Sequence, residues 1–214
     1  MKLEEKRLRL YAVTDRAWAA DTEALLAQVA DAIDGGAGIV QLREKHLDKA
    51  AFLEEAKRFV ALCREKGAIS IINDDVDIAL ASGADGIHVG QEDLAAGRAR
   101  EVLGPDKILG VSAHSVEEAL AAQAAGADYL GVGAAFVTGT KADAKPITRE
   151  TIRAVTAAVD IPAVAIGGIT RENLLELSGC GLAGVAVVSA LFGQPDVKAA
   201  AKELLALSEE MARK

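Results

Sequence analysis

Gln41, Arg43 and Lys45 alternate along one short segment, and their side chains could together bind an anion. Residues two apart in an extended strand point to the same side, so this spacing places an amide and two cations along one face. Exposed charges near the start of a helix are an equally good interpretation of Arg43 and Lys45 taken alone. A facing group of acids would favour the first interpretation, because a metal ion and cations can share one phosphorylated ligand.

Two acidic segments are candidates for that facing group. Residues 73–75 read Asn-Asp-Asp after one apolar run, and residues 91–93 read Gln-Glu-Asp after the next. Carboxylates on neighbouring loops could hold Mg²⁺, which takes one or two carboxylates and completes its shell with phosphate oxygens and water. An Asp-Asp pair after a strand is also a common helix N-cap, and seen alone it favours the cap.

Polar residues and glycines also follow four later apolar runs. They are Ser112 and His114, then Thr138, Thr140 and Lys141 in FVTGTK, then Gly167 and Gly168, and finally Val188 and Ser189. Backbone N–H groups at 167–168 and 188–189 could bind a phosphate, although glycines there also suit tight turns. The three histidines have no evident catalytic partner, and G-x-G at 131–133 lacks the third glycine of a dinucleotide site. Together these segments predict an enzyme with two phosphorylated substrates.

Eight short runs of β-branched and apolar residues are expected to position these side chains. They are residues 8–13, 38–42, 69–72, 86–89, 108–111, 129–132, 163–166 and 185–188, and helices are expected at 21–34, 49–66, 115–125, 148–159 and 171–177. Gly36, Gly83, Gly126 and Gly181 precede runs in four similar phrases, as left-handed helix caps do. This alternation predicts an α/β protein, a single-domain (β/α)₈ TIM barrel, with an open doubly wound sheet as the alternative.

Length and composition limit the class of protein. A chain of 214 residues is expected to form one catalytic domain over residues 1–214. The net charge of −8 and the aromatic content of 3% argue against a nucleic-acid partner. No apolar run approaches the roughly 18 residues of a membrane span, and the first ten residues lack the apolar core of a secretion signal. We therefore expect no membrane partner. Cys63 and Cys180 form no CxxC pair, so we also expect a cytoplasmic protein without a disulfide framework.

Seven motifs, in order and over nearly the whole chain, resemble the thiamine-phosphate synthase family. They are YAVTDR from Tyr11, QLREK from Gln41, INDDVDIALASGADGIHVGQED from Ile72, GVSAH from Gly110, GADYLGVGAAFVTGTKADA from Gly126, AIGGI from Ala165 and VAVVSA from Val185. Two features depart from the family's pattern. GAAFVTGTK lacks two prolines that the family commonly has, and KPITRE replaces a glycine-leucine-glutamate segment, so the geometry of the 136–147 loop is left open.

The resemblance implies a transferase of thiamine biosynthesis. It would join 4-amino-2-methyl-5-(diphosphooxymethyl)pyrimidine to 4-methyl-5-(2-phosphooxyethyl)thiazole, giving thiamine phosphate and pyrophosphate by a dissociative route. The implied cofactor is Mg²⁺, held by Asp74 and Asp93. The residues implied for the pyrimidine diphosphate are Gln41, Arg43, Lys45, Asn73, Ser112 and Lys141, and those for the thiazole phosphate are Thr138, Gly139, Thr140, Gly168, Val188 and Ser189. The catalytic candidates among them are Arg43, Lys45, Ser112 and Lys141.

Two other functions are left open. A related barrel of the thiazole tautomerase type keeps the thiazole phosphate site but does no coupling, and a regulatory protein binds phosphorylated ligands without catalysis. The intact QLREK segment, with Asp74, Asp93 and Lys141, argues against both, because neither function needs these residues. Magnesium-dependent release of pyrophosphate would discriminate. Barrel proteins often associate, so a homo-oligomer is also left open.

Overall fold

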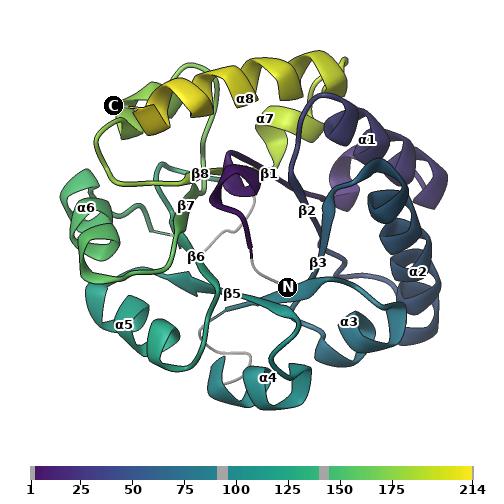
Figure 1. Ribbon diagram of the computed structural model, residues 1–214. Coiled ribbons are helices and arrows are strands. Elements are labelled where there is room, and N and C mark those ends of the chain that lie inside the picture. The colour runs from purple at the N-terminus through teal and green to yellow at the C-terminus, as the bar shows by residue number, and fades with distance from the viewer. Residues whose placement is uncertain (1–2, 91–95, 140–144, 214) are drawn as a thin grey trace.

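Eight parallel strands form a closed barrel in the computed structural model, which describes residues 3–90, 96–139 and 145–213 (Figure 1). The strands are β1 (Leu10–Val13), β2 (Ile39–Leu42), β3 (Ile69–Asn73), β4 (Gly86–Val89), β5 (Ile108–Ala113), β6 (Tyr129–Gly133), β7 (Ala163–Ile166) and β8 (Gly184–Val187). Each strand pairs with the next along the chain, and the pair Leu10 and Val185 joins β1 to β8. The predicted barrel is confirmed, and the open sheet is excluded.

Helices surround the barrel on its outer side (Figure 1). They are α1 (Thr22–Asp34), α2 (Lys49–Lys66), α3 (Val76–Ser82), α4 (Ala96–Leu103), α5 (Val116–Ala124), α6 (Arg149–Ala158), α7 (Ser189–Phe192) and α8 (Val197–Arg213). Local signals set their ends: Asp48 accepts the N–H of Ala51 at the start of α2, for example, and Gly67 ends that helix at a φ of 76°. The four glycines expected as left-handed caps all have positive φ.

Two predicted elements differ from the structure in ways that have a clear physical reason. The first strand begins at Leu10 rather than at residue 8, because Glu5–Leu8 form a 3₁₀ helix, η1, whose Leu8 is buried inside the barrel. The helix expected at 171–177 is reduced to a 3₁₀ helix, η3, at Leu174–Leu177. There the Asn173 side chain accepts the N–H of Thr170 and donates to the carbonyl of Gly168, which holds this segment in a turn.

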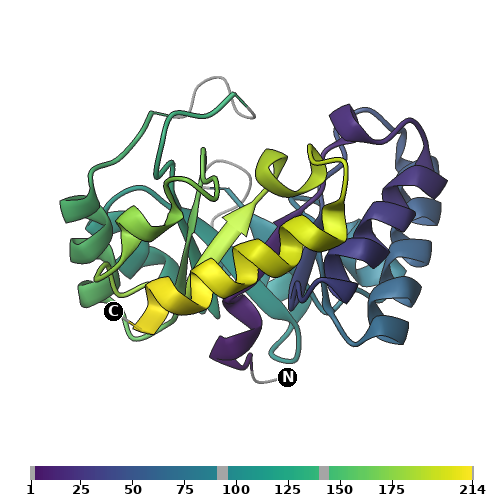
Figure 2. The same cartoon turned by 90° about the horizontal axis from the view of Figure 1, so that it is seen from above.

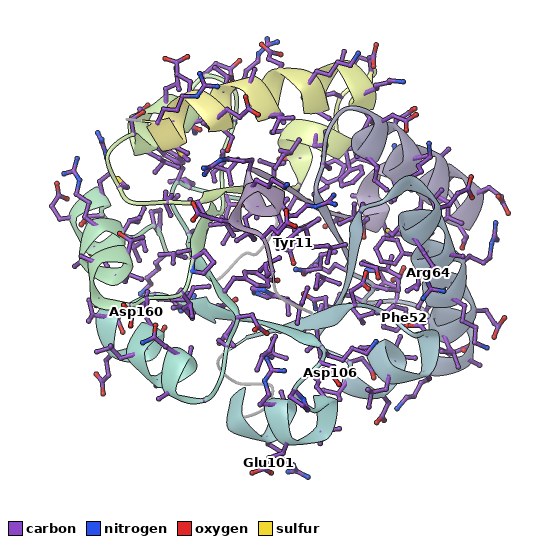
Figure 3. All side chains as sticks on the ribbon, viewed as in Figure 1. Tyr11, Phe52, Arg64, Glu101, Asp106 and Asp160 are labelled. Atoms are coloured by element: carbon purple, nitrogen blue, oxygen red, sulfur yellow. The ribbon has the colours of Figure 1, made fainter. Side chains whose placement is uncertain are left out.

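The barrel interior is filled over part of its length and hollow at one end. A buried cluster fills the lumen with Leu8, Tyr11, Val13, Ile39, Ile71, Ile108, Tyr129, Val164, Ala183 and Ala186. Figure 3 shows Tyr11 near the centre of the ring of strands. In the side view of Figure 2, η1 lies at one end of the barrel and the loops that follow the strands lie at the other. The filled lumen therefore leaves space for a ligand at the carboxyl ends of the strands.

Candidate active site

A cavity of about 380 Å³ opens at the carboxyl ends of the strands. The predicted site residues that line it are Gln41, Arg43, Lys45, Asn73, Asp74, Ser112, Thr138, Gly168, Val188 and Ser189. Gly139 is exposed and is not among the lining residues. Asp93, Thr140 and Lys141 lie outside the described residues. Residues predicted from six separate segments thus meet around one space.

The two cations after β2 lie close to carboxylates. Lys45 Nζ is 2.8 Å from Asp74 Oδ2, and Arg43 Nη1 is 3.2 Å from Asp15 Oδ2. The backbone N–H of Arg43 donates to Thr14 Oγ1 at 3.0 Å, which fixes the loop after β2 to the end of β1. The cations and a facing acid, expected from the sequence, therefore share one wall of the cavity.

Glu44 lies between the two cations in sequence but is buried outside the cavity lining. Its Oε1 accepts the backbone N–H groups of Lys45 and His46, at 2.8 and 2.9 Å. Its Oε2 is 2.7 Å from Arg16 Nη2, and the same nitrogen is 2.6 Å from Glu55 Oε2. Burial opposes ionisation of Glu44, but the N–H of His46 and the Arg16 guanidinium outweigh it and lower the pKa. This Arg16–Glu44–Glu55 cluster fixes the backbone that carries the two cations.

Asp74 and Asp75 are adjacent but have different environments. Asp75 caps α3, because its carboxylate accepts the N–H of Ile78 at 2.9 Å. Asp74 lines the cavity and is the only non-glycine residue with positive φ, 62°, in the described part of the chain. Its backbone N–H donates to the carbonyl of His88 at 2.9 Å. The N-cap interpretation therefore applies to Asp75, and the metal-ligand candidate is Asp74.

A chain of four hydrogen bonds crosses the barrel beneath the cavity. Gln41 Nε2 is 2.6 Å from the Tyr11 hydroxyl, which is 2.8 Å from the Tyr129 hydroxyl. His88 Nδ1 is 3.0 Å from the Tyr129 hydroxyl, and His88 Nε2 is 3.0 Å from Ser112 Oγ. Burial raises the pKa of both tyrosines and lowers the pKa of His88 to about 4. All three rings are therefore uncharged near neutral pH.

The turn after β7 packs against the segment that leads to Thr138. Gly168 has a φ of 65°, and a Cβ there would lie 2.3 Å from the carbonyl oxygen of Val137. The backbone N–H of Phe136 donates to the carbonyl of Gly167 at 3.0 Å. Glycine is required at 168 by both the φ and the close approach. The glycine turn and the threonine segment consequently form one wall of the cavity.

A second hollow, of about 490 Å³, lies at the other end of the barrel, and Lys6, Arg7, Arg9 and Arg213 are among the residues that line it. Two of these cations bind the protein's own backbone: Arg7 donates to the carbonyl of Gly67, and Arg9 donates to the carbonyl of Ala183. They tie the N-terminal segment to the barrel. The functional side chains of barrel enzymes lie at the carboxyl ends of the strands, so the first cavity is the candidate active site.

Several site residues were missed from the sequence. His88 was left without a role. Its neighbours Ile87 and Val89 belong to the buried cluster between the strands and the helices, so alternation along the strand turns His88 toward the lumen. That alternation was the available signal. The sequence contains no such signal for Arg16 and Glu55. These residues are far apart in the chain, and neither segment has a pattern that predicts their contact.

A closed (β/α)₈ barrel with cations, a carboxylate and a glycine turn around one cavity is the arrangement typical of barrel enzymes that bind phosphorylated small molecules. The family model for thiamine monophosphate synthase matches residues 10–191. Thiamine-phosphate synthase of Ruminiclostridium cellulolyticum is 50% identical over 92% of this chain and 93% of its own length. The enzyme of that name from Moorella thermoacetica is 52% identical over 82% of this chain and 84% of its own.

Solved structures agree with these sequence matches. Thiamine phosphate pyrophosphorylase from Pyrococcus furiosus superposes with a TM-score of 0.88 at 40% identity, covering 97% of this chain and 98% of that one. A 3-hexulose-6-phosphate synthase, at 21% identity and a TM-score of 0.69 over 93% of this chain and 99% of its own, shares the fold alone. The chain belongs to the thiamine monophosphate synthase family.

Proposed function

We propose that this protein is the transferase of thiamine biosynthesis that joins 4-amino-2-methyl-5-(diphosphooxymethyl)pyrimidine to 4-methyl-5-(2-phosphooxyethyl)thiazole. The products are thiamine phosphate and pyrophosphate. The observation that carries the proposal is the shared cavity, which has Arg43 and Lys45 on one wall and Gly168 with Ser189 on another. This arrangement supports separate binding places for two phosphorylated substrates within a single space. The names of the curated relatives support the same reaction.

Charge stabilisation is the main task of the protein in this reaction. The bond between the pyrimidine methylene carbon and the diphosphate oxygen breaks, and its electron pair leaves with pyrophosphate. The thiazole nitrogen then supplies the electron pair for the new carbon–nitrogen bond. Arg43, Lys45 and Lys141 would stabilise the charge that develops on the leaving group, and Ser112 would donate a hydrogen bond to it. Gln41 and Asn73 would hold the same substrate at near-attack distance.

The residues present fit Mg²⁺. Asp74 places a carboxylate on the cavity wall, with the amide of Asn73 and the ammonium of Lys45 beside it. Among the described residues, no group of three or more His, Cys, Asp or Glu side chains could hold a metal. A site with one or two carboxylates, here Asp74 and Asp93, suits an ion that fills its shell with phosphate oxygens and water. When bound, Mg²⁺ would neutralise charge on the pyrophosphate.

The thiazole phosphate would occupy the wall formed by the turns after β6, β7 and β8. Thr138, Gly139 and Thr140 would contact it from the first segment, and Gly168 and the 188–189 backbone from the others. Gly168 has no side chain, so a phosphate can approach its backbone closely.

A cytoplasmic location also stays a proposal. Both cysteines are free and buried, as a reducing compartment permits. No helix in the described residues is long and apolar enough to span a bilayer.

The direct test combines purified protein, both substrates and Mg²⁺, and follows thiamine phosphate and pyrophosphate, with Asp93→Ala and Lys141→Ala variants in parallel. We expect equimolar products from the wild type, and a loss of roughly a hundredfold or more in each variant. Chelation of the metal should abolish turnover. A folded protein that binds the thiazole phosphate but makes no product would instead be a tautomerase or a binding protein.

A further inference from the structure

The hydrogen-bonded chain from Gln41 to Ser112 joins two residues of the cavity wall through three residues that the proposed chemistry does not use. Tyr11, Tyr129 and His88 come from β1, β6 and β4, and the contact between the two tyrosines crosses the lumen. All three side chains are buried. A buried polar chain of this length is stable only when each donor meets an acceptor, so its hydrogens are not placed independently.

The direction of every bond follows from one end. The Gln41 Nε2 amide nitrogen can only donate, so the Tyr11 hydroxyl accepts and gives its own hydrogen to Tyr129. Tyr129 then gives its hydrogen to His88 Nδ1, which must be unprotonated. A neutral imidazole with a bare Nδ1 carries its hydrogen on Nε2 and donates it to Ser112 Oγ. A charged His88 would leave the buried hydroxyl hydrogen of Tyr129 without an acceptor.

The two ends of the chain therefore present defined groups to the cavity. Gln41 donates one of its two amide N–H groups to Tyr11 within the chain, which leaves Oε1 as the acceptor that it offers to the cavity. Ser112 accepts from His88, so its own hydrogen points away from the imidazole and Ser112 acts as a donor. If the Gln41 amide turned over, every bond would reverse, and Gln41 would become the donor while Ser112 became the acceptor.

We propose that Tyr11, Tyr129 and His88 are positioning residues that couple these two ends, so that Ser112 is a donor whenever Gln41 is an acceptor. The inference rests on the proposed function, in which an anionic diphosphate lies by Ser112 and an amino group is borne by the pyrimidine. The diphosphate needs a donor, which selects one direction of the chain. That direction makes Gln41 an acceptor for the amino group and unfavourable toward a ring with an oxo group in its place.

The unliganded protein provides the first test. A long-range ¹H–¹⁵N spectrum of ¹⁵N-labelled protein reports which ring nitrogen of His88 carries hydrogen, and loss of its signals in His88→Gln gives the assignment. We expect hydrogen on Nε2 in the wild type and a mixture of the two tautomers in Tyr129→Phe. An unchanged spectrum in Tyr129→Phe would overturn the proposal even if the protein had no synthase activity, and the other tautomer in the wild type would overturn the direction that follows from Gln41.

Kinetics provide the second test, with kcat/KM measured for the aminopyrimidine diphosphate and for its oxo analogue. We expect the preference for the amino compound to fall about tenfold in Tyr129→Phe, which leaves Gln41 and Ser112 in place. Ser112→Ala should lower this preference in the wild type but not in the Tyr129→Phe background. Ile71→Val, in the same buried cluster but outside the chain, is the packing control and should keep the preference.

Equal preference in the wild type and in Tyr129→Phe, or the same effect of Ser112→Ala in both backgrounds, would overturn the coupling. A general loss of activity in Tyr129→Phe with the preference intact would also overturn it, because a merely structural role predicts that result. A wild type that makes no thiamine phosphate would instead refute the proposed function, while the tautomer of His88 would still be measured.

Discussion

Asp74 and Asp75 are identical neighbours with different environments: Asp75 caps a helix, and Asp74 lines the cavity. Asp75 stabilises the start of α3 through the N–H of Ile78, which an asparagine does equally well. Asp74 adopts a left-handed conformation that asparagine also tolerates, but only its carboxylate carries the charge that a metal ligand needs.

Asparagine at each position should therefore separate charge from backbone conformation. We expect Asp74→Asn to lower kcat/KM about a hundredfold, with a change of stability near 0.5 kcal/mol or less. Asp75→Asn is the matched control and should keep both activity and stability. Steady-state kinetics at several Mg²⁺ concentrations, with urea unfolding, measure these effects. Equal losses of activity in the two variants would remove Asp74 from the metal site.

His88 should make the stability of the protein depend on pH. Burial lowers its pKa to about 4 in the folded protein, and the ordinary value of 6.5 applies after unfolding. The unfolded chain thus binds the extra proton between pH 6.5 and 4. Stability from this group is complete above pH 6.5 and is lost as pH falls through that window, by about 3 kcal/mol in total. Urea unfolding of metal-free protein from pH 7 to 4 should show this slope, and the slope should be smaller in His88→Gln.

At the scale of single residues, the sequence predicted the groups with a local pattern. Arg43 and Lys45 were found because both cations closely follow an apolar run, which places them at the carboxyl end of a strand beside the cavity. The resemblance named Asp74 as the metal ligand, but the local pattern could not separate it from Asp75, because their difference depends on a φ angle that the sequence does not specify. His88 needed Tyr129 as its partner, and that contact exists only after the barrel closes.

Among the elements, the loop after β2 depends on a buried ionic cluster. Both Glu44 and Glu55 have side chains that are 1% exposed, and Arg16 is the cation that lies between them. Removal of the cation would leave two carboxylates buried without a counter-charge. Such a change is usually much more costly than the loss of an ion pair at the surface.

Arg16→Met should therefore destabilise the protein by about 3 kcal/mol and raise KM for the pyrimidine diphosphate, since the backbone that carries Arg43 and Lys45 would loosen. Arg58→Met is the control, because Arg58 and Glu23 form an exposed ion pair between α2 and α1, and its effect should be under about 1 kcal/mol. Urea unfolding with activity assays gives both quantities. Equal small effects would show that the cluster does not hold the loop.

At the scale of elements, every strand was placed within a few residues, because the apolar runs and the glycine caps punctuate the chain regularly. The errors fell where tertiary contacts override local preference. Leu8 is an apolar residue that suits a strand, but it lies in a 3₁₀ helix and closes the end of the lumen. The segment at 171–177 has a composition that favours a helix, but the Asn173 side chain holds it in a turn.

For the whole molecule, a ligand of the cavity should raise the unfolding temperature. A ligand at a hundred times its dissociation constant stabilises the folded state by about 2.7 kcal/mol. In a chain of this length, that corresponds to a rise of roughly 5–10 °C. We expect pyrophosphate with Mg²⁺ to give such a rise in differential scanning calorimetry, and pyrophosphate with a chelator to give much less. An equal rise in both would contradict a metal-assisted diphosphate site.

The extent of the domain was also predicted from the sequence. We expected one domain over residues 1–214, and this stays a prediction.

The pairing of β1 with β8 has a consequence for the synthesis of the protein on the ribosome. The partner of Leu10 is Val185, and Ser208 in α8 donates a hydrogen bond to the carbonyl of Arg9 beside it. Translation at roughly 5–20 residues per second leaves one edge of β1 unpaired for about 10–35 s after it is made. Throughout that interval, the backbone N–H and C=O groups along this edge of β1 lack a partner strand and can pair with another chain. Its first strand is therefore where we expect chaperones to engage it.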